Sequence, residues 1–143
     1  MRMSVFVATV TLLGALQGCG TAPVGQDGRR LTLADVGPAP QDPMQIVRES
    51  LKYRLKDPDS AKVELDRAPR PVVFAGTIGT NGGAGWELCP QVNAKNGFGA
   101  YTGYKRVFIL WNSGSVVDFI DDYLGDAYCR ERNDYRLEVG VGK

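Results

Sequence analysis

The chain has 143 residues, of which 43% are hydrophobic and 9% aromatic, so it can form one folded domain with appendages and is too apolar to be disordered throughout. Its 17 basic and 16 acidic residues give a formal net charge of +1, which provides no bulk attraction to nucleic acid. It contains no histidine, which excludes histidine-based catalysis and His-containing zinc or copper sites. We therefore expect no nucleic-acid partner, no metal and no cofactor.

The first 18 residues are organised like a secretory signal peptide. Arg2 precedes an apolar run that ends at Leu16, which is long enough for the core of a signal peptide but short for a membrane-spanning helix. The sequence Leu16-Gln17-Gly18-Cys19 resembles the lipobox of bacterial lipoproteins. The resemblance implies cleavage before Cys19, diacylglycerol on its sulfur and an acyl chain on its new amino group. The alternative is an ordinary signal peptide followed by an incidental cysteine.

Several acyl chains on Cys19 would hold the mature chain to a membrane permanently, whereas a single chain holds a protein only marginally. Gly20 follows the cysteine in place of aspartate, and the resemblance to lipoprotein sorting signals then favours the outer membrane. We expect an outer-membrane lipoprotein that faces the periplasm. Removal of Arg2 with the leader leaves 16 basic and 16 acidic residues, so the mature chain is neutral.

Two regions are expected after the leader. Residues 19–41 begin with the lipidated cysteine and are rich in Gly, Ala, Pro, Gln and Asp, a composition that predicts a flexible tether with at most a brief helical turn closed by Gly37. Residues 42–143 are expected to form the globular domain.

The domain is expected to begin with a helix from Pro43 to Lys56. Asp42 suits the N-cap, and proline suits the first helical position. Apolar residues then recur every three or four positions, which gives the helix one face for packing. Asp57, which precedes Pro58, should end it, because a residue before proline avoids helical backbone angles.

The remaining sequence favours antiparallel strands joined by short turns, followed by a second helix that starts near Asp121 or Asp122. In that helix Leu124, Ala127 and Tyr128 are predicted to face the sheet. The fold class is therefore α+β, a single small domain with an N-terminal helix packed on a curved antiparallel sheet of four to five strands, plus a C-terminal helix. The predicted strands are 61–65, 71–79, 86–94, 100–111 and 115–120, with a weaker candidate at 135–143.

The longest of these strands contains an uninterrupted apolar run, Val107–Trp111, which is typical of a central strand covered on both faces.

Cys89 and Cys129 are the two cysteines left after Cys19. In an oxidising periplasm such a pair usually forms a disulfide, and the pair lacks the CxxC spacing of a redox site.

The stretch from Cys89 to Lys105 is the best candidate for a binding surface. Asn96-Gly97 predicts a turn, since both residues tolerate positive φ, and Gly103 within a strand indicates a bulge or bend. Tyr101 and Tyr104 would point to opposite faces of a regular strand, so they share a surface only if Gly103 introduces a bulge. The alternative is that they pack across strands for structural reasons. The candidate residues are Asn93, Lys95, Asn96, Phe98, Tyr101, Tyr104 and Lys105.

Two catalytic interpretations are weaker. Asp118, Asp121 and Asp122 include a carboxylate pair of the kind that a small hydrolase needs, but the last two stand where a helix cap belongs. The segment 76–85 is rich in glycine but lacks the Gly-Lys-Ser/Thr ending of a phosphate-binding loop, so a hairpin loop is expected.

Three stretches, GPAPQD, LKDPDSAK and VNAKNGFGAYTGYK, together resemble a group of small exported bacterial proteins, often lipoproteins, of uncharacterised function. The similarity covers roughly residues 37–110, and Ala100 departs from the glycine usual in that group. It implies export but no activity. We expect a non-enzymatic envelope protein that binds a partner protein or a wall polymer; the alternatives are an inhibitor of a cell-wall hydrolase such as lysozyme and, last, a small hydrolase.

Overall fold

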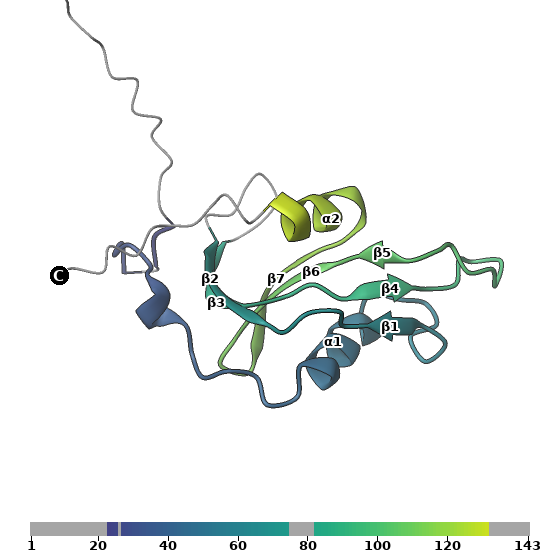
Figure 1. Ribbon diagram of the computed structural model, residues 1–143, viewed down its shortest axis with the longest axis horizontal. Coiled ribbons are helices and arrows are strands. Elements are labelled where there is room, and N and C mark those ends of the chain that lie inside the picture. Colours follow the sequence, from purple (N-terminus) through teal and green to yellow (C-terminus); the bar gives the residue numbers. More distant parts are fainter. Residues whose placement is uncertain (1–22, 26, 75–81, 132–143) are drawn as a thin grey trace, which may run out of the picture.

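Two helices enclose a bent antiparallel β-structure in the computed structural model, which describes residues 23–25, 27–74 and 82–131 (Figure 1). Within these residues seven strands form two sheets, one with the order β1-β4-β5 and one with the order β2-β3-β6-β7. The elements are η1 (Leu33–Asp35), α1 (Pro43–Lys52), β1 (Lys62–Glu64), β2 (Arg70–Phe74), β3 (Gly83–Leu88), β4 (Gln91–Asn93), β5 (Lys105–Arg106), β6 (Phe108–Asn112), β7 (Ser115–Ile120) and α2 (Asp122–Glu131).

The two sheets are joined by a long ribbon in which β3 and β4 run antiparallel to β6 and β5. The register is continuous, because Leu88 pairs with Ile109 in one sheet and Gln91 pairs with Arg106 in the other. Pro90 interrupts the ladder because it has no N–H to donate, although its carbonyl oxygen still accepts from the Val107 N–H at 3.0 Å. The predicted α+β class is confirmed, and each of the two long predicted strands is divided at this point.

α1 begins where its sequence predicts, but it ends four residues before the predicted end at Lys56. The Asp42 side chain accepts a hydrogen bond from Gln45 N at 2.9 Å, and Pro43 occupies the first turn. The helix ends at Lys52, because the next N–H, that of Tyr53, bonds to Leu51 O. The end predicted at Lys56 is therefore wrong, because the last turn of the helix tightens and closes before the chain reaches Pro58.

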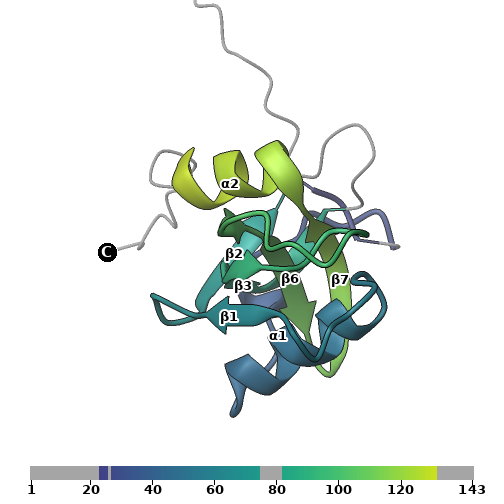
Figure 2. The same cartoon turned by 90° about the vertical axis from the view of Figure 1, so that its right-hand side faces the viewer.

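The apolar run Val107–Trp111, most of which forms β6, is covered on both faces, as its sequence predicts. Val107 and Ile109 belong to a core cluster with Val47 and Leu51 of α1. Phe108 and the other residues facing the opposite way pack in a second cluster that includes Cys129 of α2. Figure 2 shows the arrangement, with α1 below the strands and α2 above them.

α2 is tied to the end of β3 by the predicted disulfide, Cys89–Cys129, whose sulfur atoms are 2.05 Å apart. Tyr128 packs on Phe74 and Phe108, as expected for the inner face of the helix. Leu124, predicted to face the sheet, is instead 54% exposed. The next residue, Gly125, is buried instead. A Cβ atom at this position would lie 2.5 Å from Ile120 O, so the helix turns its glycine toward the sheet because only glycine allows this close backbone contact.

Part of the predicted tether belongs to the folded domain. Leu33–Asp35 forms a 3-10 helix with a capping box from Thr32. Beyond it, the Gly37 N–H donates to Asn112 Oδ1 at 2.9 Å, and Trp86 Nε1 donates to Gly37 O at 2.8 Å. The brief helical turn allowed for this segment is present, and backbone groups of residues 35–37 are bonded to side chains of β3 and β6.

Several predictions lie outside the described residues: the signal peptide, Cys19, most of the glycine-rich segment 76–85 and the strand at 135–143. β2 and β3 are antiparallel partners, in agreement with a hairpin connection, but β3 begins at Gly83, so residues 83–85 pair with β2 and the strand start predicted at Trp86 is wrong by three residues. Among the helices of the described residues, none has both the length and the apolar character needed to cross a bilayer.

Candidate binding surface

The hairpin that joins β4 and β5 projects beyond both helices at one end of the molecule (Figure 1). Its turn is closed by Gly99 N donating to Asn96 O at 3.0 Å, and Asn96 Oδ1 accepts from the N–H groups of Phe98 and Ala100. The turn lies where Asn96-Gly97 predicts it, but the positive φ, 82°, is at Gly99. An asparagine side chain that bonds two backbone N–H groups stiffens this turn.

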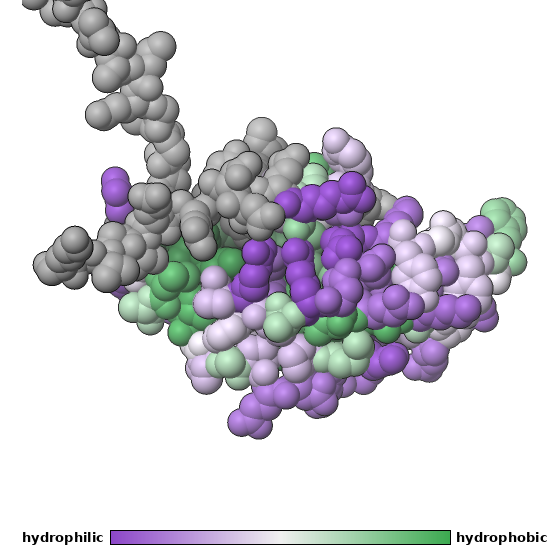
Figure 3. All heavy atoms as spheres, in the orientation of Figure 1, coloured by the Kyte–Doolittle hydropathy of each residue, from purple (hydrophilic) through white to green (hydrophobic). Residues whose placement is uncertain are grey.

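Phe98 is at the tip of this turn, and its side chain is 99% exposed. Figure 3 shows the tip as a hydrophobic end whose neighbours along the hairpin are pale or hydrophilic. A fully exposed phenylalanine contributes nothing to the core, because burial is what makes an apolar side chain stabilising. The fold therefore presents this ring to solvent on a stiff support.

The predicted bulge is present at Gly103. Val92 pairs with Lys105, whereas Lys95 pairs with Tyr101, so the returning strand contains one residue more than its partner over this interval. Gly103 has φ of 94°, and its N–H donates to Asn93 Oδ1 at 3.0 Å. A one-residue bulge reverses the alternation of side chains across the strand.

The bulge places Tyr101 and Tyr104 on the same face of the three-stranded sheet. Tyr101 Oη donates to Ser60 O at 2.9 Å, and Tyr104 Oη donates to Glu64 Oε1 at 2.7 Å. The hydrogen bond to the Glu64 carboxylate raises the pKa of Tyr104 above its ordinary value. Both rings remain partly open to solvent, at 42% and 45% exposed, and their hydroxyl bonds hold them in one orientation.

Cations surround the first of these rings. Lys62 Nζ lies 4.7 Å from the centroid of the Tyr101 ring, and Lys95 Nζ lies 5.5 Å from it. Lys95 also lies 3.7 Å from a carboxylate oxygen of Asp57. We call the surface formed by Lys62, Asn93, Lys95, Tyr101 and Tyr104 the tyrosine face.

The tyrosine face continues toward α2 through a charged network. Arg106 forms two hydrogen bonds with the Asp66 carboxylate, at 3.1 and 2.9 Å, and Gln91 Nε2 donates to the same carboxylate. The Arg106 hydrogen bond is the main cause of the lowered pKa of Asp66. This end of the sheet face is therefore held together by charge-assisted bonds.

Not every predicted residue lies on the tyrosine face. Asn96 and Phe98 form the tip, whereas Lys105 pairs with Val92, which is buried on the α1 side of the sheet. Directly paired residues share a face, so Lys105 belongs to the α1 side. Sequence reasoning missed Lys62 and Glu64, since nothing in the sequence indicates that β1 pairs with β4.

The carboxylates considered for catalysis lie in different environments. Asp118 is buried in β7 and accepts from Phe119 N, whereas Asp121 is exposed at the start of α2; the Asp122 side chain is outside the described part. Among the residues that the structure describes, no three His, Cys, Asp or Glu side chains form a group suited to a metal ion. The geometry therefore adds nothing to the hydrolase interpretation.

No protein-family model, no curated protein and no solved structure matches this chain significantly. The tyrosine face and the hairpin tip must therefore be interpreted from their own chemistry.

Proposed function

We propose that this protein is a lipid-anchored component of the bacterial cell envelope and a non-enzymatic binding module. Its binding element is the hairpin 93–105, which takes up a partner protein or an envelope polymer. The observation that supports this best is the bulge at Gly103, which gathers two half-exposed tyrosines on one face beside an exposed Phe98. Tyrosine and phenylalanine are enriched in protein interfaces.

Preorganisation supports the same proposal. The turn is held by Asn96, and both tyrosine hydroxyls bond to the segment 60–64. Side chains that are already ordered lose little conformational entropy when a partner binds, which leaves more of the contact energy for affinity.

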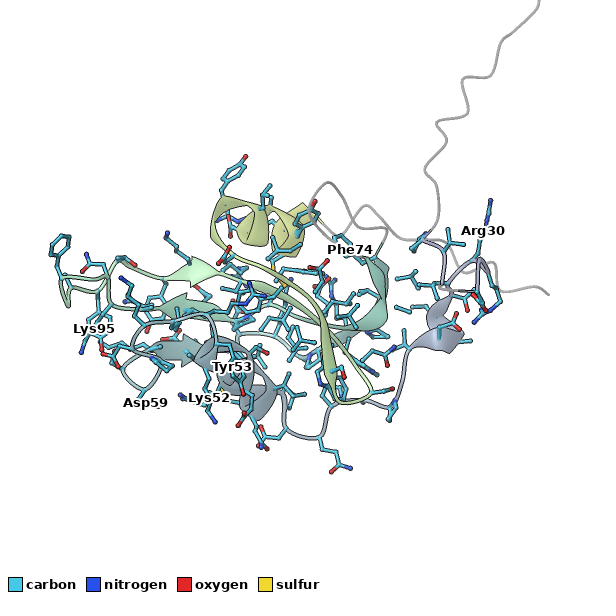
Figure 4. The ribbon with its side chains drawn as sticks, turned by 180° about the vertical axis from the view of Figure 1, so that it is seen from behind. Arg30, Lys52, Tyr53, Asp59, Phe74 and Lys95 are labelled. Carbon is cyan, nitrogen blue, oxygen red and sulfur yellow. A yellow bond between two sulfur atoms is a disulfide. The ribbon has the colours of Figure 1, made fainter. Side chains whose placement is uncertain are left out.

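The position of the hairpin also suits an anchored protein. Arg30 and Lys95 lie at opposite ends of the molecule, and the described chain begins near the Arg30 end (Figure 4). Pro23 follows the proposed anchor at Cys19 by four residues, and four residues span at most about 14 Å. A lipid on Cys19 would thus keep the Arg30 end near the membrane and direct the hairpin away from it.

The anchor makes the first prediction. Metabolic labelling with an acyl-chain probe should label the wild-type chain and not the Cys19→Ser variant, because serine provides no sulfur for the lipid. Gel fluorescence of the purified chain measures the label. A Cys89→Ser variant serves as control, since that cysteine is committed to a disulfide, and it should keep the label. Equal labelling of the Cys19→Ser variant would contradict the anchor.

The hairpin makes the second prediction. Changing Phe98, Tyr101 and Tyr104 to alanine should remove most of the partner from a pull-down after crosslinking in intact envelopes, because these rings form the proposed contact. Quantitative mass spectrometry measures recovery. Tyr123→Ala is the matched control, since Tyr123 is 83% exposed on α2 and lies outside the hairpin. Unchanged recovery with the triple variant would overturn the surface assignment.

An inhibitor of a cell-wall hydrolase is the second candidate. The projecting tip with its exposed Phe98 favours it, because a narrow, stiff hairpin can enter an enzyme cleft. In the same pull-down, a hydrolase among the proteins lost from the triple variant would select this candidate over a structural partner.

A further inference from the structure

A pocket lined by three arginines lies where the segment after β1, the strand β5 and the end of α2 meet. Its volume is about 330 Å³, and it is separate from the hairpin tip. The lining residues are Asp66, Arg67, Arg106, Cys129 and Arg130.

Among the described residues around this pocket, positive charges outnumber negative ones. Arg106 is bonded to Asp66, and Arg130 is bonded to Asp126 at 2.8 Å. Glu87, which is not part of the lining but lies 3.5 Å from Arg67, accepts from Arg70 at 2.7 Å. In these three pairs, each carboxylate is matched with one guanidinium group. Among the described residues here, the fourth guanidinium group is that of Arg67.

Arg67 is the least compensated of the four arginines. Its Nη2 lies 3.5 Å from Glu87 Oε1, farther than that of Arg70, and donates to the neutral carbonyl oxygen of Cys129 at 2.8 Å. Desolvation is the largest influence on the pKa of Arg67 and lowers it, the attraction of Glu87 opposes that effect, and the repulsion of Arg70 and Arg106 lowers the pKa further. An anion in the pocket would relieve that repulsion.

The pocket is also held in shape before any ligand arrives. The Cys129 carbonyl that orients Arg67 belongs to a disulfide-bonded residue, and its neighbour Arg130 is on the same helix. A guanidinium group presents N–H donors in a planar fork that matches the two oxygens of a carboxylate or a phosphate.

We propose that this pocket, with Arg67 at its centre, binds a small oxyanion, either a carboxylate or a phosphate group. The ligand would receive N–H donors from Arg67, and it would also be attracted by Arg106 and Arg130, whose charges Asp66 and Asp126 offset in part. The inference is independent of the lipid anchor and of the tyrosine face, because it uses residues of neither.

Isothermal titration calorimetry of the full-length chain in detergent micelles tests it. Inorganic phosphate and acetate are titrated separately, with chloride at equal ionic strength as the reference, so the two arms distinguish the source of the oxyanion. We expect binding of at least one of them, and a dissociation constant at least about tenfold higher for Arg67→Gln, because a charge-assisted hydrogen bond is lost.

Two further variants make the test decisive. Arg48→Gln removes the same charge from the exposed face of α1 and should bind as the wild type does. Arg130→Gln, whose side chain is 74% exposed, should fold normally and bind several-fold more weakly, which covers the case in which Arg67→Gln fails to fold. Absence of binding by both anions, or equal binding by the Arg130→Gln variant and the Arg48→Gln control, would overturn the proposal.

Discussion

Replacing both Cys89 and Cys129 with alanine should lower the free energy of unfolding by about 4 kcal/mol, the value that chain entropy gives for a closed loop of this length. The two cysteines are 40 residues apart, so the disulfide restricts a large part of the unfolded chain. It also fastens α2 to the end of β3, and both cysteines are buried, with 1% and 2% of their surfaces exposed. Denaturant unfolding followed by circular dichroism measures the difference.

Reduction provides the control for this prediction. A thiol reductant should destabilise the wild-type chain by a similar amount and leave the doubly substituted chain unaffected, since that chain has no bond to reduce. A loss below about 1 kcal/mol for the double substitution would mean that the packing of α2, and not the covalent bond, holds that end of the domain.

Phe108→Ala should be comparably destabilising, at about 4 kcal/mol, because truncating a buried phenylalanine loses transfer free energy and leaves a cavity. Phe108 is fully buried at 0% exposure, and its ring contacts Phe74 at 5.1 Å and Tyr128 at 5.9 Å between centroids. The substitution therefore removes the central ring of the cluster between β6 and α2. Thermal and urea unfolding measure the change.

Val116→Ala is the matched control for Phe108, since it also shortens an apolar side chain on a strand of the same sheet. Val116 is 43% exposed, so its truncation should cost less than about 1 kcal/mol. Similar losses for the two variants would contradict the assignment of Phe108 to the core.

The elements that local sequence controls are those that the sequence predicts well. The start of α1 depends on Asp42 and the proline beside it, which act within one helical turn. The two-sided burial of β6 follows from an apolar run that no amphipathic element would contain. The turn at residues 96–99 depends on the Asn96 side chain, which bonds only to its near neighbours.

Predictions that depend on packing between distant segments are less accurate. Leu124 is apolar and was expected to face the sheet, but Gly125 is the residue that the close approach of the Ile120 and Arg106 carbonyl groups requires. Residues 32–37 have the composition of a linker, yet they are bonded to Asn112 and Trp86, which lie 49 or more positions further along the chain. Composition carries no information about such partners.

The sequence alone determined the α+β class, the helix start, the turn and the pair of cysteines, because caps, turns and alternation act over a few residues. Only the tertiary structure decided that Tyr101 and Tyr104 share a face and that Arg67, Arg106 and Arg130 share a pocket. The reason is physical: the bulge at Gly103 is defined by its register against β4, and the partners that hold the two tyrosines, Ser60 and Glu64, are 40 or more residues away in the chain.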